Sequence, residues 1–481
     1  MILTGAGLYM LIMLGIGFYA SRGSHSVTGF IVAGRSLPIW ICSVSIFATW
    51  FGSGIMMGAA TSGYDHDFLL MIGEPFGSGL ALLLSGLFFA RIMRRSRRLT
   101  WVEFFEARYG NVAAVFGALA DLAAGIIWLG GVLFTFGVLL ESLTGLPMAV
   151  GIFGGLVVIV IYTMIGGMWA VALTDFVQVI ILTIGLVVLS VIVLDDVGGW
   201  GAVAEKLPED TLRFFPVDHS YKNWIEYIHV WMTLGIAAIA ANSVIQRALS
   251  ARTEIVAQNS FLIAAVAYVV IGVIPIMLGM VASVSMPGIE DPNAVLTDIA
   301  VTHLRPIFVV LFVGAILSSI MSTSDSILLS SAAIISTNLL PRVVKDPNDE
   351  LRLKITRWSI PFIALAASYI AFGTERVVEV LIQSAAPLLA MTIVPFVLCF
   401  WWEKANRYGA LGGIFGGLVG WLVSAQFETV TPPDLIGFVV SLVTMVIVTL
   451  LTQRIDPPRP ITDDQGGVVP LRDRIATFRS V

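Results

Sequence analysis

The segment Gly314–Leu339, GAILSSIMSTSDSILLSSAAIISTNL, decides how the rest of this sequence folds. It lies in a long apolar run that begins after Arg305, yet hydroxyl side chains and one aspartate, Asp325, crowd its middle. A helix that crosses about 30 Å of hydrocarbon needs roughly 20 apolar residues, and small hydroxyls are tolerated because they bond to carbonyls of their own helix. A carboxylate is costly there, so we expect Asp325 to face water, an ion or a partner.

The hydroxyl groups of this segment recur at spacings of three and four, which places one set of them on a single helix face. The members of this set are Ser319, Ser322, Thr323, Ser326 and Ser330. That face offers oxygen atoms and no soft ligands, which is the donor set that a hard monovalent cation prefers. Small residues also let membrane helices pack closely, so packing stays the alternative for any single hydroxyl.

The composition is that of a polytopic membrane protein. The chain has 481 residues, of which 57% are hydrophobic and 12% charged, whereas soluble proteins average about 25% charged residues. No basic cluster indicates nucleic-acid binding. The two cysteines, Cys42 and Cys399, both lie in apolar segments, and the five histidines show no ligand spacing. Neither a disulfide framework nor a zinc site is therefore predicted.

Thirteen apolar runs are long enough to be membrane-spanning helices. They comprise residues 1–20, 37–62, 68–90, 111–143, 147–165, 170–194, 223–245, 259–284, 306–338, 355–373, 377–402, 408–426 and 435–452. A signal peptide carries its positive charge before the apolar run, whereas here Arg22 follows it. We therefore expect an uncleaved first helix with its N-terminus outside the cell.

The loop charges agree with this orientation. All but five of the 27 Lys and Arg residues fall on the inner side, as the positive-inside rule requires. The outer ones are Lys206, Arg213, Lys222, Arg305 and Arg376. The largest outer loop, Asp195–Trp224, is acidic. We expect a multi-pass protein of the inner (plasma) membrane with a cytoplasmic tail, residues 453–481, that is polar and loosely ordered.

Two of the runs contain signs of a helix break. In the second run, GSG at residues 52–54 lets backbone carbonyls leave the helix and face a cavity. The seventh run, with Gly235 and Asn242 followed by Ser243, is a weaker case. Discontinuous helices mark the binding site of a transporter, although a close-packing glycine face is the alternative for the second run. The two runs lie five apart, as the first helices of two inverted five-helix repeats do.

The segment GGMWAVALTDFVQVIILTIG, Gly166–Gly185, stands between the fifth and sixth runs. Gly166 and Gly167 predict a tight inner turn. Asp175 and Gln178 then share one face of the following helix. An acid at the membrane interface is the alternative for Asp175.

This segment, together with MSTSDS at Met321–Ser326 and RYGALGG at Arg407–Gly413, resembles the signatures of the sodium/solute symporter family. The resemblance extends over residues 29–416 and includes the QR pair at 246–247. It implies an all-α fold with a leucine-transporter-type inverted repeat. The core would be 37–402, with the first helix and loop (1–36) and the last two helices (403–452) as additions to a single transporter domain, 1–452.

The resemblance also implies a bound sodium ion, Na+. Its ligands would be the carbonyls of Ala48, Phe51 and Ser319 and the hydroxyls of Ser322 and Thr323. Asp175 would lie near the inner exit of that ion.

Within the family, the ATWFGSG and LLSGLFFARIMR stretches resemble the high-affinity choline transporters most. Trp50 and Trp128 fall where those transporters carry aromatic residues, which suit quaternary ammonium groups. Ala241 replaces a tryptophan of that pattern, and Glu74 resembles the acid of sodium/sugar members. We expect Glu74 to face the substrate cavity, with an ion pair or interfacial placement as the alternative. The expected substrate contacts are Trp50, Glu74, Trp128, Asn242 and Gln383.

These features predict a sodium-coupled secondary symporter that imports a small organic solute by alternating access. An amine-bearing or zwitterionic solute is preferred, such as an amino acid or a choline-like compound. A sugar or monocarboxylate symporter and a transporter-like membrane sensor are the alternatives. No enzyme is predicted, because no pair of nucleophile and base occurs. The expected partners are the solute, sodium and the lipid bilayer, with no nucleic acid, and the chain is expected to be a monomer.

Overall fold

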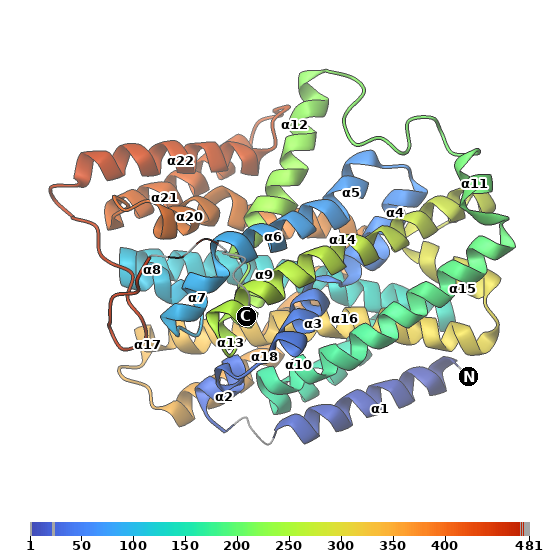
Figure 1. Cartoon of the computed structure of the whole chain (residues 1–481), viewed down its shortest axis with the longest axis horizontal. Helices are drawn as coiled ribbons and strands as arrows, with labels where there is room; N and C mark the ends of the chain where they lie inside the picture. The colour runs from blue at the N-terminus through green and yellow to red at the C-terminus, as the bar shows by residue number, and fades with distance from the viewer. Residues whose placement is uncertain (1, 22–24, 472, 474, 476–481) are drawn as a thin grey trace.

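Long apolar helices, most of which run along the long axis of the molecule, form the protein (Figure 1). The computed structural model describes residues 2–21, 25–471, 473 and 475. Arg22, which helped to orient the first helix, lies outside the described residues. Within them, the only extended pairings are two isolated bridges, Leu37 with Ala251 and Thr462 with Val468.

The helices of the first half follow one another with short connections. In chain order they are α1 (Ile2–Ala20), α2 (Val27–Val32), η2 (Ala33–Arg35), α3 (Ile39–Trp50), η3 (Gly54–Gly58), α4 (Ala59–Tyr64), α5 (Phe68–Ile72), η4 (Gly73–Gly77), α6 (Ser78–Phe88), α7 (Ala90–Ser96), α8 (Val102–Tyr109), α9 (Asn111–Thr144), α10 (Met148–Asp196) and α11 (Gly199–Ala204).

The second half begins after the long loop that follows α11. Its helices are α12 (Tyr221–Val230), η5 (Trp231–Ile236), η6 (Ala237–Ala240), α13 (Asn242–Ser250), α14 (Glu254–Ser285), η7 (Pro292–Ala294), α15 (Val295–His303), α16 (Pro306–Ile334), η8 (Ile335–Leu339), α17 (Leu340–Val343), α18 (Asp349–Phe372), α19 (Val377–Pro387), η9 (Leu388–Thr392), α20 (Ile393–Trp401), α21 (Arg407–Ser424) and α22 (Pro433–Thr452).

Among the described residues, eight helices are long and apolar enough to cross a membrane, and ten if each of two bent helix pairs counts as one span. The bent pairs are the second and seventh predicted runs, Ile39–Trp50 with Gly54–Tyr64 and Tyr221–Ala240 with Asn242–Ser250. The predicted total of thirteen stays a prediction. The difference lies in α1, α21 and the two halves of α10.

The turn predicted at Gly166 and Gly167 divides α10 into two helices. A straight helix of 49 residues would be about 74 Å long, far more than a bilayer needs. Gly167 has φ 62° and ψ −167°, a conformation that side chains other than glycine rarely adopt. A Cβ atom there would also lie 2.8 Å from the carbonyl oxygen of Phe30. The glycine is therefore required both by its backbone and by the close approach of α2.

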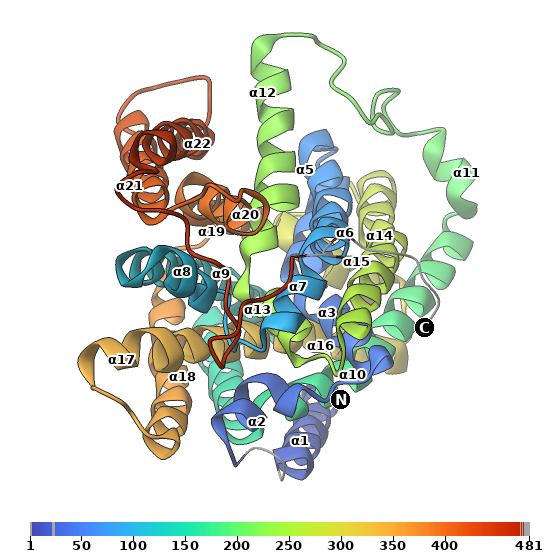
Figure 2. The same cartoon turned by 60° about the vertical axis from the view of Figure 1, so that its left-hand side comes forward.

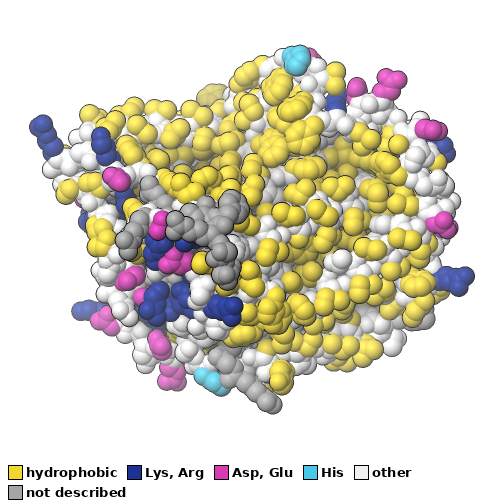
Figure 3. Space-filling model, viewed as in Figure 1, with side chains coloured by type: hydrophobic (Ala, Val, Ile, Leu, Met, Phe, Trp, Pro, Cys, Tyr) yellow, Lys and Arg dark blue, Asp and Glu magenta, His cyan; other side chains and the backbone are white. Residues whose placement is uncertain are grey.

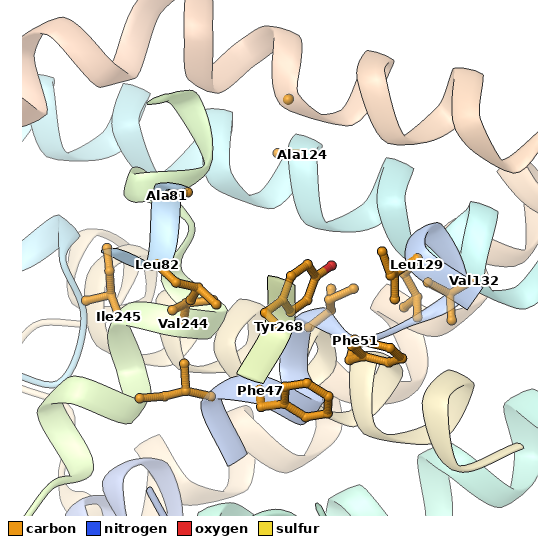
Figure 4. Packing of buried hydrophobic residues seen from close by; sticks show 14 of the residues in the cluster. Phe47, Phe51, Ala81, Leu82, Ala124, Leu129, Val132, Val244, Ile245 and Tyr268 are labelled. Carbon is orange, nitrogen blue, oxygen red and sulfur yellow. The ribbon is translucent and has the colours of Figure 1, made fainter. Parts of the chain in front are cut away.

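The helix α16, which holds the hydroxyl-rich segment up to Ile334, lies at the centre of the bundle. Every residue from Val313 to Ile334 is buried, and α16 packs against α10, α9, α1, α3, α13 and α18. A helix that is covered on all sides belongs to a core. Beside it, Phe47 and Phe51 stack with centroids 4.7 Å apart, and Tyr268 of α14 meets Phe51 edge to face at 5.5 Å (Figure 4).

The prediction that the tail is loosely ordered is wrong for residues 461–469. Thr462 and Val468 form a bridge, and Ile461 and Val469 are 2% and 4% exposed. The backbone N–H of Asp464 donates to the carbonyl of Ser96 at the end of α7 (3.1 Å). The tail thus crosses α7 (Figure 2). Residues 472, 474 and 476–481 of the predicted tail lie outside the described residues.

Candidate ion and substrate site

The first helix break exposes backbone oxygens at the end of α3. The helix ends at Trp50, and Phe51 has φ −74° and ψ 61°. The segments on either side differ in direction by 56°. Carbonyls in the last turn of a helix lack intrahelical partners. Here they meet hydroxyls of α16, since Ser322 Oγ donates to the carbonyl of Ala48 (3.0 Å) and Ser319 Oγ to that of Phe51 (2.9 Å).

The structure brings together all five residues expected to bind sodium. Besides these two contacts, Ser322 Oγ lies 3.1 Å from the Ser319 carbonyl. Thr323 Oγ1 is buried without a hydrogen-bond partner among the described residues, although buried hydroxyls almost always have one. An orphan oxygen beside several carbonyl oxygens fits a hard cation. These oxygens would hold sodium. Sodium binding would then depend on the conformation of the broken helix at the end of α3.

Gly52 allows α16 to approach this break. A Cβ atom at position 52 would lie 2.1 Å from Thr323 Oγ1 and 3.0 Å from Thr323 Cβ. Only glycine therefore permits the observed distance between the broken helix and the hydroxyl face of α16.

A cluster of buried charges lies between α3, α10, α13 and α16. Asp175 is fully buried, and its Oδ2 accepts from Ser45 Oγ (2.5 Å) and lies 3.9 Å from the guanidinium of Arg247. Asp175 Oδ1 has no partner in the described structure. The fully buried position argues against an interfacial acid.

Asp325 has protein partners, as its cost in an apolar helix led us to expect. It accepts hydrogen bonds from the hydroxyl of Tyr162 and from Ser326 Oγ (3.2 Å). Arg247 also donates to Ser326 Oγ. Arg247 thus pairs with Asp175 and reaches Asp325 through the Ser326 hydroxyl, and its burial is compensated by charges of opposite sign.

A cavity lies next to the first break and is lined by four of the five predicted substrate residues, Trp50, Glu74, Trp128 and Asn242. Gln383 does not line it. Its side chain is exposed and faces a separate cavity beside Tyr369 and Arg376. The neighbouring Ser384 lines the central cavity instead.

Glu74 lies where a third helix loses its regular conformation. Within η4, Glu74 has φ −117° and ψ 119°. It is 6% exposed, and its two oxygens accept hydrogen bonds from Ser78 Oγ (2.7 Å) and the Tyr268 hydroxyl (2.8 Å). The predicted alternative was an ion pair or an interfacial placement near Asp65 and Asp67. Among the described residues Glu74 forms no ion pair, whereas Asp65 pairs with Arg376 and Asp67 caps α5.

The second break is at Ala241, whose ψ of 118° separates η6 from α13. The next residue, Asn242, is held on three sides. Its backbone N–H donates to Asp121 Oδ1 (3.1 Å), its Nδ2 donates to the Ser330 carbonyl (3.2 Å), and its Oδ1 accepts from the backbone N–H of Trp101 (3.4 Å). Asn242 therefore borders the cavity with most of its hydrogen-bonding capacity already used.

Sequence reasoning missed Asp121. This residue of α9 is 6% exposed and lines the cavity, and its Oδ1 also accepts from Trp101 Nε1 (3.2 Å). The signal was present, because Asp121 is an acid well inside the fourth apolar run. Ser78 and Tyr268 were also missed. Neither residue type is costly enough in a membrane helix to be conspicuous.

The lining of the cavity contains acidic side chains and no basic one. Two carboxylates, Glu74 and Asp121, line it, and its lining residues, all of them described, include no Lys, Arg or His. Trp50 and Trp128 also line it, and indole rings attract cations through their faces. The arrangement suits a solute that carries positive charge or hydrogen-bond donors.

Comparison with known proteins agrees with this geometry. A family model described as "Sodium:solute symporter family" matches residues 30–417. The human high affinity choline transporter 1 is 26% identical over 436 residues, which cover 85% of this chain and 74% of the relative. The osmoregulated proline transporter OpuE of Bacillus subtilis (strain 168) is 23% identical and covers 94% of this chain and 95% of its own.

Among solved structures, a Na+-coupled sialic acid symporter in a substrate-bound outward-open state matches with a TM-score of 0.83. The identity is 21%, and the match covers 96% of this chain and 99% of that one. This likeness shows the fold, and the predicted leucine-transporter-type arrangement is confirmed.

Proposed function

The chain belongs to the sodium:solute symporter family, and on that premise we propose that it imports a small amine-bearing or zwitterionic solute together with sodium by alternating access. The family consists of multi-pass membrane transporters rather than enzymes, and it implies sodium coupling. What the cavity adds is the class of solute.

The observation that carries the proposal is the charge of the cavity. Glu74 and Asp121 bring two acidic side chains to a space that Trp50 and Trp128 also line, so a positively charged group would be attracted both by Coulomb forces and by cation–π contact. A simple carboxylate anion would meet repulsion from both acids. The monocarboxylate alternative is therefore disfavoured.

A zwitterionic solute also fits. Gly54, which lines the cavity, begins η3, and the first N–H groups after a helix break lack intrahelical partners. These donors and the Ser384 hydroxyl would take the carboxylate of an amino acid, while Glu74 would take its ammonium. Ala241 leaves more room than a tryptophan would, which favours a larger or zwitterionic solute over choline.

The decisive experiment is counterflow of labelled solute in proteoliposomes. Purified protein would be assayed with and without sodium against amino acids, quaternary amines, sugars and short carboxylates. Sodium-dependent exchange of an amine or amino acid is expected. Exchange of sugars alone would support the sugar alternative, and binding without exchange would support a sensor.

The variant Glu74→Gln tests the cavity directly. We expect it to abolish uptake of a cationic or zwitterionic solute while leaving sodium binding largely intact, because Glu74 is not among the proposed sodium ligands. Ser85→Ala on α6, outside the cavity lining, is the matched control and should transport normally. Normal transport by Glu74→Gln, or a carboxylate anion as the solute, would contradict this reading of the cavity.

We also propose that the N-terminus is outside, that the tail is cytoplasmic and that the chain acts as a monomer. Cys42 and Cys399 are buried, so introduced cysteines can be read with little background. A label in the loop Asp195–Trp224 should react with an impermeant reagent in intact cells, and a label at Gln465 should not. Reaction of the tail from outside would mean that the number of spans is wrong by one.

A further inference from the structure

A basic crevice lies where the end of α7 meets the start of α14, away from the transport site. The residues that line it are Arg91, Arg94, Arg95, Arg97, Arg252, Thr253, Glu254 and Ile255. In the proposed orientation this is the cytoplasmic end of two membrane-spanning helices. Figure 3 shows basic side chains gathered at the end of the molecule where α7 lies, next to apolar surface.

Positive charge exceeds negative charge in this crevice. Five arginines line it and Glu254 is its one acid, and Glu254 is already paired with Arg95 at 2.7 Å. The tail contributes the carbonyl of Pro470, which accepts from Arg95. Arg97 and Arg252 are exposed side chains. The guanidinium groups of Arg97 and Arg252 therefore lie at the rim, and neither forms an ion pair with a carboxylate of the described residues.

Arg94, which also lines the crevice, likewise has no acidic side chain as its hydrogen-bond partner among the described residues. The guanidinium of Arg94 is held by backbone carbonyls, those of Ala251 and Arg252 (3.2 Å), rather than by an acid. Burial, and then the proximity of Arg35 and Arg97, lowers the pKa of Arg94. Of the tail acids, Asp464 pairs with Arg35 at 3.4 Å and Asp473 acts on Arg95. An anion in the crevice would relieve this repulsion.

An exposed apolar stripe begins at the rim of the crevice. Ile255 lines the crevice and is 38% exposed. Further along α14, exposed aliphatic side chains continue on the same face at helical spacing. They are Ile263, Val266, Val270 and Val273. A ligand that filled both features would carry an anionic head and a long apolar chain.

We propose that this crevice binds the phosphate of an anionic phospholipid from the inner leaflet, with an acyl chain along the stripe of α14. The planar guanidinium groups of Arg97 and Arg252 match the geometry of phosphate oxygens. Basic pockets between membrane helices on the cytoplasmic side are known to suit such head groups. A free phosphate would use the arginines but not the stripe, which is why the lipid is the better occupant.

The test uses the full chain in nanodiscs and native mass spectrometry. Retention of phosphatidylglycerol is compared with retention of phosphatidylcholine of the same acyl chains, with inorganic phosphate as a separate arm. We expect selective retention of phosphatidylglycerol, and about a tenfold loss of its affinity in the double variant Arg97→Gln/Arg252→Gln.

The double variant Lys345→Gln/Lys354→Gln is the matched control, because it removes two exposed positive charges from another part of the proposed cytoplasmic side, the loop before α18 and the start of α18. It should retain phosphatidylglycerol as the wild type does. An unchanged melting temperature of both variants in phosphatidylcholine would show that they fold. Equal retention of both lipids, equal loss in the control, or competition by inorganic phosphate at the lipid's own concentration would overturn the proposal.

Discussion

The chain breaks two of its membrane helices, and the surroundings of the two breaks differ. At the first, the Ala48 and Phe51 carbonyls meet hydroxyls of α16, and Thr323 Oγ1 has no protein partner among the described residues. At the second, protein groups use most of the hydrogen-bonding capacity of Asn242, through Asp121, Trp101 and Ser330. The bends are similar, 56° and 43°.

The difference shows that a break alone does not make an ion site. A break frees backbone groups, and the facing helix decides what they bind. The same helix, α16, faces both breaks. It offers Ser322 and Thr323 to the first and only the carbonyl of Ser330 to the second. We therefore expect substitutions at the first break to change sodium dependence and those at the second to change stability.

The largest effect is expected from Gly52→Ala at the first break. The new Cβ would lie 2.1 Å from Thr323 Oγ1 and 3.0 Å from its Cβ, so α16 must move away. Loss of about two ligands corresponds to roughly a hundredfold rise in the sodium concentration for half-maximal uptake. Gly154→Ala is the control, because nothing lies within 4 Å of its added Cβ. Unchanged sodium dependence in Gly52→Ala would show that the first break does not contribute to sodium binding.

The next effect is expected at the second break, in stability. Asn242→Ala removes the bond to the Ser330 carbonyl and leaves the Trp101 N–H unpaired, which costs about 2 kcal/mol. The ratio of unfolded to folded protein should rise about thirtyfold, with sodium dependence unchanged. Denaturant unfolding of purified protein measures this. Asn223→Ala, at the outer end of the same bent pair, is the control. A shift in the sodium dependence of Asn242→Ala would instead show that the second break also contributes to sodium binding.

A smaller effect is expected from removing one hydroxyl at the first break. Ser322→Ala and Thr323→Ala should each raise the half-maximal sodium concentration about tenfold, one ligand being worth about 1.4 kcal/mol. Ser319→Ala should have less effect, because Ser319 is expected to contribute its carbonyl. Uptake by the wild type that does not depend on sodium would contradict the proposed sodium site.

The two helix breaks and the oxygen-rich face of α16 could be predicted from the sequence. Glycines or regularly spaced hydroxyl groups within an otherwise apolar run are typical of a binding site inside the membrane. It could not separate the roles of hydroxyls on that face. Ser330 Oγ bonds to the Ile327 carbonyl of its own helix, as does Ser326 Oγ to the Ser322 carbonyl. Helical spacing is the same for a ligand and for a hydroxyl that bonds back.

The misses have separate physical causes. Gln383 was expected at the cavity, but Ser384 is there, since one residue turns a helix by about 100° and the sequence does not fix where α19 begins. The tail was expected to be loose because of its prolines, yet Ile461 and Val469 are buried. Asp121 was missed because no cluster of hydroxyl residues surrounds it in its apolar run. The free-energy cost of placing its carboxylate in an apolar helix is nevertheless the same as for Asp325.

The smallest effect is expected from Asp121→Asn, which asks whether the second break is only a structural joint. The variant keeps an oxygen that can accept from Trp101 Nε1 and from the Asn242 N–H, both of which now use Asp121 Oδ1. It therefore removes charge while leaving the joint intact. Because Asp121 also lines the cavity, a cationic solute should bind about threefold more weakly, a change of roughly 0.7 kcal/mol.

The measurement is the solute concentration for half-maximal uptake, taken together with sodium dependence and denaturant unfolding. Both of the latter should stay at wild-type values in Asp121→Asn, whereas Asp121→Ala should also lower stability because it leaves the Trp101 and Asn242 donors unpaired. If solute affinity stays unchanged in Asp121→Asn, the second break is purely structural and Glu74 alone supplies the charge of the cavity. If sodium dependence shifts, the two breaks are coupled through α16, and their division into an ion site and a structural joint does not hold.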